Sequence, residues 1–267
     1  MKILIFSGSH SRHLYVQSSI VGSDVDYHAI VMGRENIIPE TPNGLSPKDE
    51  NNFIRHFEDR HEVEARAFGN LKPADVFDSE RMTLINPEEL NSSKVLKIVK
   101  SHNFDFSFIF GPDMIKDPVL SALPKYKINL HLGLSPWYKG SATLFWPFYF
   151  LEPQFAGITL HNITEKPDQG DIFHQSVPKL SMGDGIHDVA AKAVEKARNE
   201  VLAMIDKFKV SGELKLSSQK TSGRVWRTSD FEPAHLRVIY DLYDNDIVDH
   251  YLRGSLSKKK PILINGL

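Results

Sequence analysis

The chain contains no cysteine among its 267 residues. A disulfide framework, a thiol nucleophile and a thiolate metal site are therefore excluded. The sequence also lacks the run of about 18 apolar residues that a membrane span requires, and the apolar stretch at residues 2–6 is too short for a signal peptide. We expect a cytoplasmic protein with no membrane partner.

The chain has no marked excess of either charge. Its 32 Lys and Arg face 34 Asp and Glu, for a net charge of −2. Such a balance offers no general field for wrapping a polyanion, so we expect no nucleic-acid partner, although a local basic site remains open. Hydrophobic residues at 41% and charged residues at 25% are typical of a globular protein with a sizeable core.

The hydrophobic pattern alternates between short apolar runs and longer amphipathic segments. The order predicts an α/β fold: a Rossmann-like, mostly parallel sheet with helices on both faces. Predicted strands cover residues 2–6, 27–32, 104–110, 128–132, 156–162 and 171–177. Predicted helices cover residues 14–20, 52–68, 86–102, 117–123 and 184–208.

A Ser- and Lys-rich break at residues 211–222 divides the chain. We predict a core domain at residues 1–210 and a C-terminal extension at residues 211–267, with a short strand or arm near 223–227 and two short helices at 231–243 and 246–252. So short an extension cannot bury much surface alone, so it must dock on the core or on a second subunit. A homodimer is one expectation.

The turn after the first strand is rich in small and polar residues. It would present backbone N–H groups and a helix N-terminus to an anion, but it lacks a full G-x-G-x-x-G pattern, and an ordinary turn with solvated side chains remains open. We predict that it binds the substrate through Gly8, Ser9, His10, Ser11, Arg12 and His13.

The predicted helix at 52–68 carries a dense charged face. Such a face is usually only solvated. If it instead borders a site, Arg55, Arg60 and His61 would meet a phosphate or a glutamate tail.

Two polar residues alternate with apolar ones at the end of a predicted buried strand. Asn129 and His131 leave the same face of that strand, and burying them without partners would cost about 1–3 kcal/mol each. A satisfied core pair is the simpler interpretation of such a pattern alone. However, the small residues that follow at 133–140 allow close approach to the main chain, and Asp168 lies in a turn between two later strands.

The carboxyl ends of parallel strands share one edge of a sheet, where ligands bind. Gly8, Gly111 and His131 each lie at the carboxyl end of a predicted strand. Their convergence predicts a site at this edge independently of any motif.

The motifs resemble those of a known family. The strings I-N-L-H-x-G-L-S-P-x-Y-K-G, G-I-T-L-H and D-Q-G-D-I occur in this order between residues 104 and 175. They are similar to the signature of the formyltransferases that use 10-formyltetrahydrofolate. Within this resemblance, the stretch 133–136 and Lys139 depart from the usual Ser-Leu-Leu-Pro and arginine, which affects the supporting turn.

The resemblance implies formyl transfer to a primary amine. The catalytic residues would be Asn129, His131 and Asp168: the first two, with His131 protonated, would stabilise the oxyanion, and the third would hold His131 protonated and assist proton removal. It implies 10-formyltetrahydrofolate as co-substrate and no metal. The folate would be bound by Phe110, Gly111, Pro112, Asp113, Met114, Ile115, Glu165 and Lys166, and Tyr138, Lys139 and Gly140 would join the substrate site.

The acceptor is less well defined. The length and acidic balance argue against a tRNA acceptor, and the short extension is similar to that of the sugar-nucleotide N-formyltransferases, which implies a nucleotide-linked amino sugar used for surface polysaccharide such as lipopolysaccharide. Another small amine such as glycinamide ribonucleotide, hydrolysis of the formyl donor, and a non-catalytic folate-binding protein remain alternatives.

Overall fold

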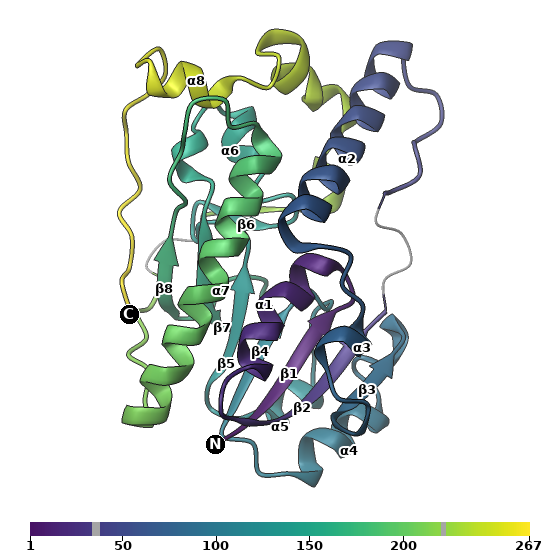
Figure 1. The fold of residues 1–267 in the computed structure, drawn as a ribbon, viewed down its shortest axis with the longest axis vertical. Coiled ribbons are helices and arrows are strands. Elements are labelled where there is room, and N and C mark those ends of the chain that lie inside the picture. The colour runs from purple at the N-terminus through teal and green to yellow at the C-terminus, as the bar shows by residue number, and fades with distance from the viewer. Residues whose placement is uncertain (34–37, 220–222) are drawn as a thin grey trace.

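The computed structural model describes residues 1–33, 38–219 and 223–267. In these ranges the central feature is a seven-stranded sheet with the order β3-β2-β1-β4-β5-β7-β8 (Figure 1). The first five of these strands run parallel, whereas β7 is antiparallel to β5 and β8 to β7. The strands are β1 (Lys2–Gly8), β2 (Asp26–Met32), β3 (Met82–Ile85), β4 (Phe106–Phe110), β5 (Lys127–His131), β7 (Ile158–Asn162) and β8 (Ile172–Ser176).

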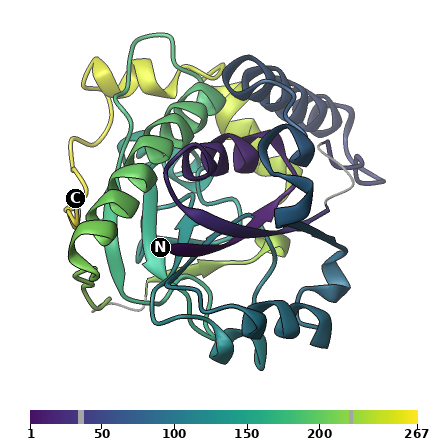
Figure 2. The same cartoon turned by 60° about the horizontal axis from the view of Figure 1, so that its bottom comes forward.

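Helices cover both faces of the sheet, which confirms the predicted fold class. Two of them, α1 (Ser11–Val21) and α7 (Ile186–Ser211), lie side by side over one face (Figures 1 and 2). The other face is covered by α4 (Ser93–Ser101) and the short α5 (Val119–Ala122).

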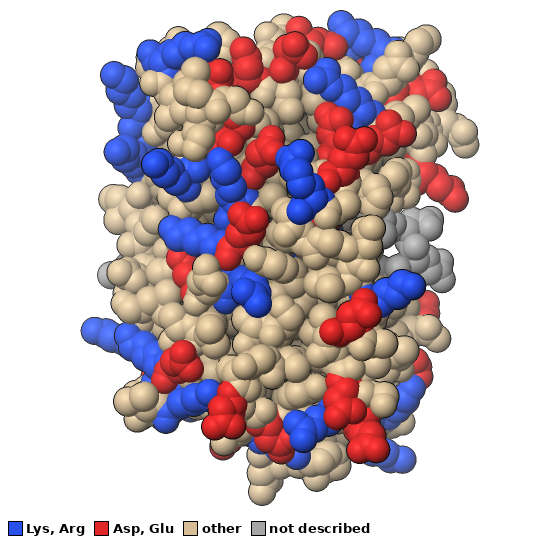
Figure 3. Space-filling view, in the orientation of Figure 1, with Lys and Arg blue, Asp and Glu red and all other residues tan. Residues whose placement is uncertain are grey.

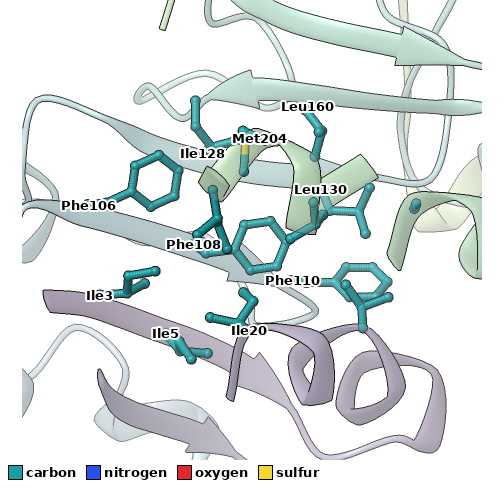
Figure 4. Close-up of a cluster of buried hydrophobic side chains, with 14 of the residues drawn as sticks. Ile3, Ile5, Ile20, Phe106, Phe108, Phe110, Ile128, Leu130, Leu160 and Met204 are labelled. Atoms are coloured by element: carbon teal, nitrogen blue, oxygen red, sulfur yellow. The ribbon is translucent and has the colours of Figure 1, made fainter. Parts of the chain in front are cut away.

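Alternation along the strands sorts side chains between the two faces. Ile3 and Ile5 join the core beneath α1 and α7, whereas Leu4 and Phe6 face α4 and α5. Because both faces are buried, the central strands read as continuous apolar runs. Figure 4 shows part of the first core, in which side chains of β1, β4, β5 and β7 meet Ile20 and Met204.

A third apolar cluster joins the C-terminal extension to the core. It contains Trp146, Trp226, Leu236, Ile239 and Val248. The extension lies across the top of the molecule in Figure 1, next to α2 (Pro47–Phe68). It therefore docks on the rest of its own chain, one of the two expectations; the boundary at residue 211 stays a prediction.

The extension is helical at the two predicted places, although the first helix is irregular in type. The segment predicted as one helix over 231–243 contains a short turn at Pro233–His235 and a π-helix at Val238–Leu242, and α8 spans Ile247–Leu252. Pro233 opens this helical stretch, at a position where its missing N–H would have no partner within the helix. A further short turn lies at Thr228–Asp230, and part of the predicted break, 220–222, falls outside the described residues.

The predicted helix at 86–102 is also interrupted. A single turn at Pro87–Glu89, capped by Asn86, precedes α4. Between them, Asn91 donates to the carbonyl of Met114 (3.0 Å) and accepts from the N–H of Lys116 (2.7 Å). The break thus places an amide side chain against the loop that follows β4. The edge strand β3 was not predicted from the sequence.

A two-stranded parallel sheet attaches the extension to the segment that follows β5. It pairs β6 (Tyr138–Gly140) with β9 (Arg224–Trp226). Gly140 has φ +89°, and a Cβ there would lie 2.0 Å from the carbonyl oxygen of Trp226. The close approach of the two strands therefore requires glycine.

Replacing Gly140 by alanine should separate β6 from β9. We expect the free energy of unfolding to fall by about 3 kcal/mol, from the left-handed backbone and the clash together. Urea unfolding measures this change. The matched control is Gly183→Ala, because Gly183 has φ +83° and nothing within 4 Å of a Cβ. Equal losses for the two variants would show that β6 and β9 do not need the contact.

Candidate active site

A large cavity opens at the carboxyl ends of β4 and β5. Its volume is about 930 Å³, and its wall includes Asn129, His131 and Asp168. Ile128 and Leu130 point to the opposite face, into the core beneath α1 and α7. The strand alternation thus directs the two polar side chains of β5 toward the cavity, and the loop after β7 brings the carboxylate.

Asp168 is the most densely contacted group of the site. Its Oδ2 accepts the N–H of Gly140 at 2.7 Å and lies 3.4 Å from Nδ1 of His131. Its Oδ1 lies 3.2 Å from Nε2 of His161. Burial alone would raise the pKa of Asp168, but the two histidines and the Gly140 N–H outweigh it and hold the pKa well below its usual value.

The contacts of His131 fix its proton. Nε2 lies 2.8 Å from the carbonyl of Tyr138, which can only accept, so this nitrogen carries a hydrogen. Burial lowers the pKa of His131, although Asp168 and the Tyr138 carbonyl act in the opposite sense. The neutral ring therefore turns an unprotonated Nδ1 toward Asp168, which makes this pair a ready proton acceptor.

His161, opposite Asn129 in the β5–β7 register, completes the cluster. Its Nδ1 donates to the carbonyl of Asn162 (2.7 Å), so Nε2 faces both Asp168 and the side-chain nitrogen of Asn129, 3.4 Å away. The second hydrogen of the Asn129 amide can point into the cavity. His161 ends the G-I-T-L-H motif, but the motif alone assigned it no role; its position opposite Asn129 follows from the strand register.

A buried hydrogen-bond network supports the turn after β5. Thr159 donates to the carbonyl of Gly133 (2.7 Å) and accepts the N–H of Ser135 (3.0 Å), while Gln175 donates to the carbonyl of Ser135 (2.6 Å). A Cβ on Gly133 would lie 2.5 Å from Nε2 of His131. The turn therefore packs directly against the catalytic candidate and leaves no room there for a side chain.

The predicted folate residues lie mostly on one wall of the large cavity. Phe110, Gly111, Pro112, Asp113, Met114, Ile115 and Lys166 all line it. Glu165 instead borders a shallower cavity with Lys127 and Asn162. Asn91 holds the carbonyl of Met114 and the N–H of Lys116, so the wall is fixed through its backbone.

The extension supplies another wall that sequence analysis missed. Val225, Trp226, Arg227 and Thr228 line the large cavity. Trp226 stacks on Trp146 with ring centroids 3.9 Å apart. The Arg224 guanidinium lies 3.5 Å from the centroid of the Trp226 ring. The β6–β9 pairing brings this segment to the site.

A second cavity of about 340 Å³ adjoins the first. Arg12, Leu132 and Ala142 line both. The second cavity lies between α1, α2 and α7, and its further lining comprises His13, His56, Phe57, Arg60, Glu64, Phe68, Thr143, Leu144, Phe145, Ile186, His187, Ala190, Ala191, Val194 and Phe231. The charged helix α2 therefore borders the second cavity, through Arg60. Arg55 and His61 do not line this cavity, and Arg55 instead pairs with Asp59 and Asp244.

The predicted substrate residues are spread between these places. Arg12 borders both cavities and His13 the second, where the His13 ring packs against Phe110. Gly8 lies next to His13 and Gly111. Gly8, Ser9, His10 and Ser11 line neither cavity.

Of the three predicted residues in β6, only Gly140 lines the large cavity. The Tyr138 hydroxyl donates to Glu152 (3.2 Å), away from the cavity, and Tyr138 contributes its carbonyl to His131 instead. The Lys139 side chain is fully buried and lines neither cavity.

On the face in Figure 3, the described residues form no region of one charge that would indicate a ligand. Positive and negative side chains are intermixed over the face in Figure 3. Outside residues 34–37 and 220–222, no three histidine, aspartate or glutamate side chains are grouped to hold a metal ion. None of the helices in the described ranges is long and apolar enough to cross a membrane.

The fold and the cluster together define a class of protein. An amide, two imidazoles and a carboxylate at the strand ends of an α/β sheet suit acyl transfer to an amine, the chemistry of a transferase. The chain belongs to the formyl transferase family, whose model matches residues 53–205, more than half of the chain. This confirms the resemblance found in the motifs, and the protein is a transferase of this folate-dependent family.

Solved structures agree with the assignment. A 4-N formyltransferase from Francisella tularensis has a TM-score of 0.57 at 17% identity, over 86% of this chain and 77% of that chain. The formyltransferase PseJ from Anoxybacillus kamchatkensis, in complex with UDP-4,6-dideoxy-4-formamido-L-AltNAc and tetrahydrofolate, has a TM-score of 0.54 at 16% identity, over 92% and 96%. Phosphoribosylglycinamide formyltransferase from Anaplasma phagocytophilum has a TM-score of 0.54 at 15% identity, over 85% and 98%. At these identities the likeness concerns the fold.

The contacts of Asp168 give a stability prediction with a definite sign. A carboxyl whose pKa is lowered by folding stabilises the protein above its unfolded pKa of about 3.9 and loses that contribution as the pH falls further. We expect Asp168→Asn to lower the free energy of unfolding by about 2 kcal/mol at pH 7. The difference from the unmodified protein should shrink progressively below about pH 4.

Denaturant titrations at several pH values measure this difference. Asparagine also tolerates the left-handed backbone of Asp168, at φ +52°. The control is Asp171→Asn, because the Asp171 side chain is exposed three residues away. A difference of the same size at pH 2.5 and pH 7 would contradict the prediction.

Proposed function

We propose that the protein transfers the formyl group of 10-formyltetrahydrofolate to the primary amine of a nucleotide-linked amino sugar. The observation that carries this proposal is the junction of the two cavities. Asn129, His131 and Asp168 line the larger one, and the smaller one offers a charged pocket beside it. The formyl donor would lie against the wall at 110–115, and the acceptor would enter from the pocket beneath α2.

Asn129 is the group best placed to stabilise the oxyanion. When the amine attacks the formyl carbon, a C–N bond forms and the carbonyl oxygen gains negative charge. Both ring nitrogens of His131 face the Tyr138 carbonyl and Asp168, so the Asn129 amide remains to donate to that oxygen. One such donor typically lowers the barrier by about 3 kcal/mol.

His131 and Asp168 would receive the proton that the amine loses. The Tyr138 carbonyl keeps hydrogen on Nε2 of His131, so the proton arrives at Nδ1, where Asp168 stabilises the imidazolium. The tetrahedral intermediate then collapses with cleavage of the bond to the folate nitrogen, and that nitrogen takes up a proton. This role for His131 differs from the oxyanion donor expected from the resemblance, because its ring nitrogens are already engaged.

The charges of the smaller cavity support an anionic acceptor. Arg12 pairs with Glu64 at 2.6 Å, and Arg60 lines the same cavity. Burial, with Arg12 adding to it, lowers the pKa of Arg60 to about 10, so its guanidinium stays charged at neutral pH. Arg12 and Arg60 therefore bring two guanidiniums to this cavity, and a phosphate of the acceptor would be a suitable ligand for them.

The nucleotide-linked sugar is favoured over glycinamide ribonucleotide by the lining of this cavity. Phe57, Phe145 and Phe231 give it aromatic walls next to the charged groups, which suits a sugar and a base as well as a phosphate. The structurally similar enzyme from Anoxybacillus kamchatkensis contains a UDP-linked formamido sugar together with tetrahydrofolate.

Incubation with 10-formyltetrahydrofolate and a panel of amines tests the function. The panel contains UDP- and dTDP-linked amino sugars and glycinamide ribonucleotide, with mass spectrometry as readout. We expect a nucleotide-linked amino sugar to gain one formyl group, and Arg60→Leu to raise its KM about tenfold, since a charge-assisted hydrogen bond contributes about 1.5 kcal/mol or more. The control Arg55→Leu removes a guanidinium on the same helix that lines neither cavity.

The other outcomes distinguish the alternatives. A formyl gain only on glycinamide ribonucleotide would overturn the sugar acceptor. Turnover of the donor at full rate without any amine would indicate hydrolysis. Folate binding without turnover would indicate a binding protein.

Asn129→Ala tests the oxyanion role. We expect kcat to fall by about 10²–10³-fold with little change in the affinity for folate, because the lost hydrogen bond acts mainly in the transition state. Steady-state kinetics and a folate-binding titration measure the two effects. Asn103→Ala, at an exposed position, serves as the control. A kcat within a factor of three of the unmodified enzyme would remove Asn129 from this role.

A further inference from the structure

Two buried histidines form the polar end of the smaller cavity. His56 on α2 and His187 on α7 line it, with ring centroids 4.5 Å apart and exposed fractions of 6% and 7%. Nδ1 of His56 is hydrogen-bonded to the Tyr240 hydroxyl at 2.9 Å. The mechanism proposed above uses neither ring, and neither was singled out from the sequence.

The partners of His187 define its hydrogen-bonding state. Its ring donates to the backbone carbonyl of His56, and Nε2 has no partner among the residues that the structure describes. The donor is therefore Nδ1, and Nε2 of the neutral ring carries a lone pair. Burial, reinforced by Arg60 and Arg12, lowers the pKa of His187 to about 3, so the ring is neutral at physiological pH.

The surroundings of Nε2 leave an acceptor to be satisfied by a ligand. The neighbouring lining from α7 is Ile186, Ala190, Ala191 and Val194, none of which carries a side-chain donor. The Arg60 and Arg12 guanidiniums act on the ring through their charge but make no hydrogen bond to Nε2. A buried acceptor without a partner costs about 1–3 kcal/mol. A molecule that brings a donor into this cavity recovers that cost, whereas one without a donor does not, so the group discriminates between ligands.

We propose that His187 determines acceptor specificity by accepting a hydrogen bond from a hydroxyl or amide N–H on the sugar ring of the acceptor. This inference rests on the proposed function. In this proposal the smaller cavity recognises two groups of the acceptor. The guanidiniums bind a phosphate, and His187 accepts a hydrogen bond from an uncharged donor. A sugar that lacks the donor would bind less tightly while its amine still met the catalytic cluster.

Substitution of His187 tests this role. His187→Phe keeps an aromatic ring but removes the acceptor, and His187→Gln restores an acceptor oxygen. For the nucleotide-linked amino sugar we expect KM to rise about tenfold in His187→Phe, the equivalent of one hydrogen bond, with kcat within a factor of three and unchanged KM for the formyl donor. His187→Gln should recover part of the loss.

The control is His174→Phe. His174 is equally buried, at 6% exposure, but lines neither cavity. It should lower stability without changing the KM for the acceptor. A purely structural role of His187 would instead alter kcat and both KM values together.

Deoxy acceptors complete the experiment as a double-mutant cycle. Removing the hydroxyl or amide that His187 reads should cost the unmodified enzyme about tenfold in kcat/KM, and should cost His187→Phe nothing further. An unchanged acceptor KM in His187→Phe, or equal losses in both enzymes for every deoxy acceptor, would overturn the role of His187 alone. Failure of the unmodified enzyme to formylate any nucleotide-linked amino sugar would overturn the proposed function and this inference with it.

Discussion

The contacts of Asp168 with one backbone N–H and two histidine rings organise the active site. The carboxylate is reached by Gly140 of β6, by His131 of β5 and by His161 of β7. Gln219 of the extension donates to the carbonyls of Asp168 (2.8 Å) and Gly170 (2.7 Å), which holds the loop itself. A charge so far buried is tolerable only because each of these partners is in place.

This dependence explains features that otherwise look unrelated. Gly140 must be glycine so that β9 can approach β6, and the same residue offers its N–H to Asp168. The turn after β5 is built on buried side chains of Thr159 and Gln175, which hold it against His131. The sheet sets the direction in which the polar side chains point, and the segments that follow its strands supply hydrogen-bond partners for them.

The sequence predicted the fold and the family better than the details of the site. The apolar runs at 2–6 and 104–110 identify central strands because a parallel sheet buries both of their faces. The edge strand β3 escaped notice, since Leu84 is exposed and the strand has only four residues. The break before α4 also escaped, because it depends on contacts between Asn91 and residues more than twenty positions away.

Within the site too, the features set by local sequence were predictable, whereas those set by tertiary contacts were not. Asn129 and His131 share a strand face by simple alternation, so their common direction was predictable. The wall formed by Trp226 depends on pairing between strands more than 80 residues apart. The cavity beneath α2 depends on the packing of α2 and α7, and no local sequence pattern relates these two helices. Tyr138 was predicted to bind the substrate, which stays a prediction; in the structure its carbonyl, and not its ring, reaches His131.

The shared wall of Arg12, Leu132 and Ala142 has a consequence for the order of events. In the proposed reaction the donor and the acceptor occupy adjoining compartments, and neither needs to leave before the other arrives. The protein therefore has no need to carry the formyl group itself between two half-reactions. In that reaction, transfer would take place directly within a complex of the protein and both substrates, held on either side of the wall that these three residues form.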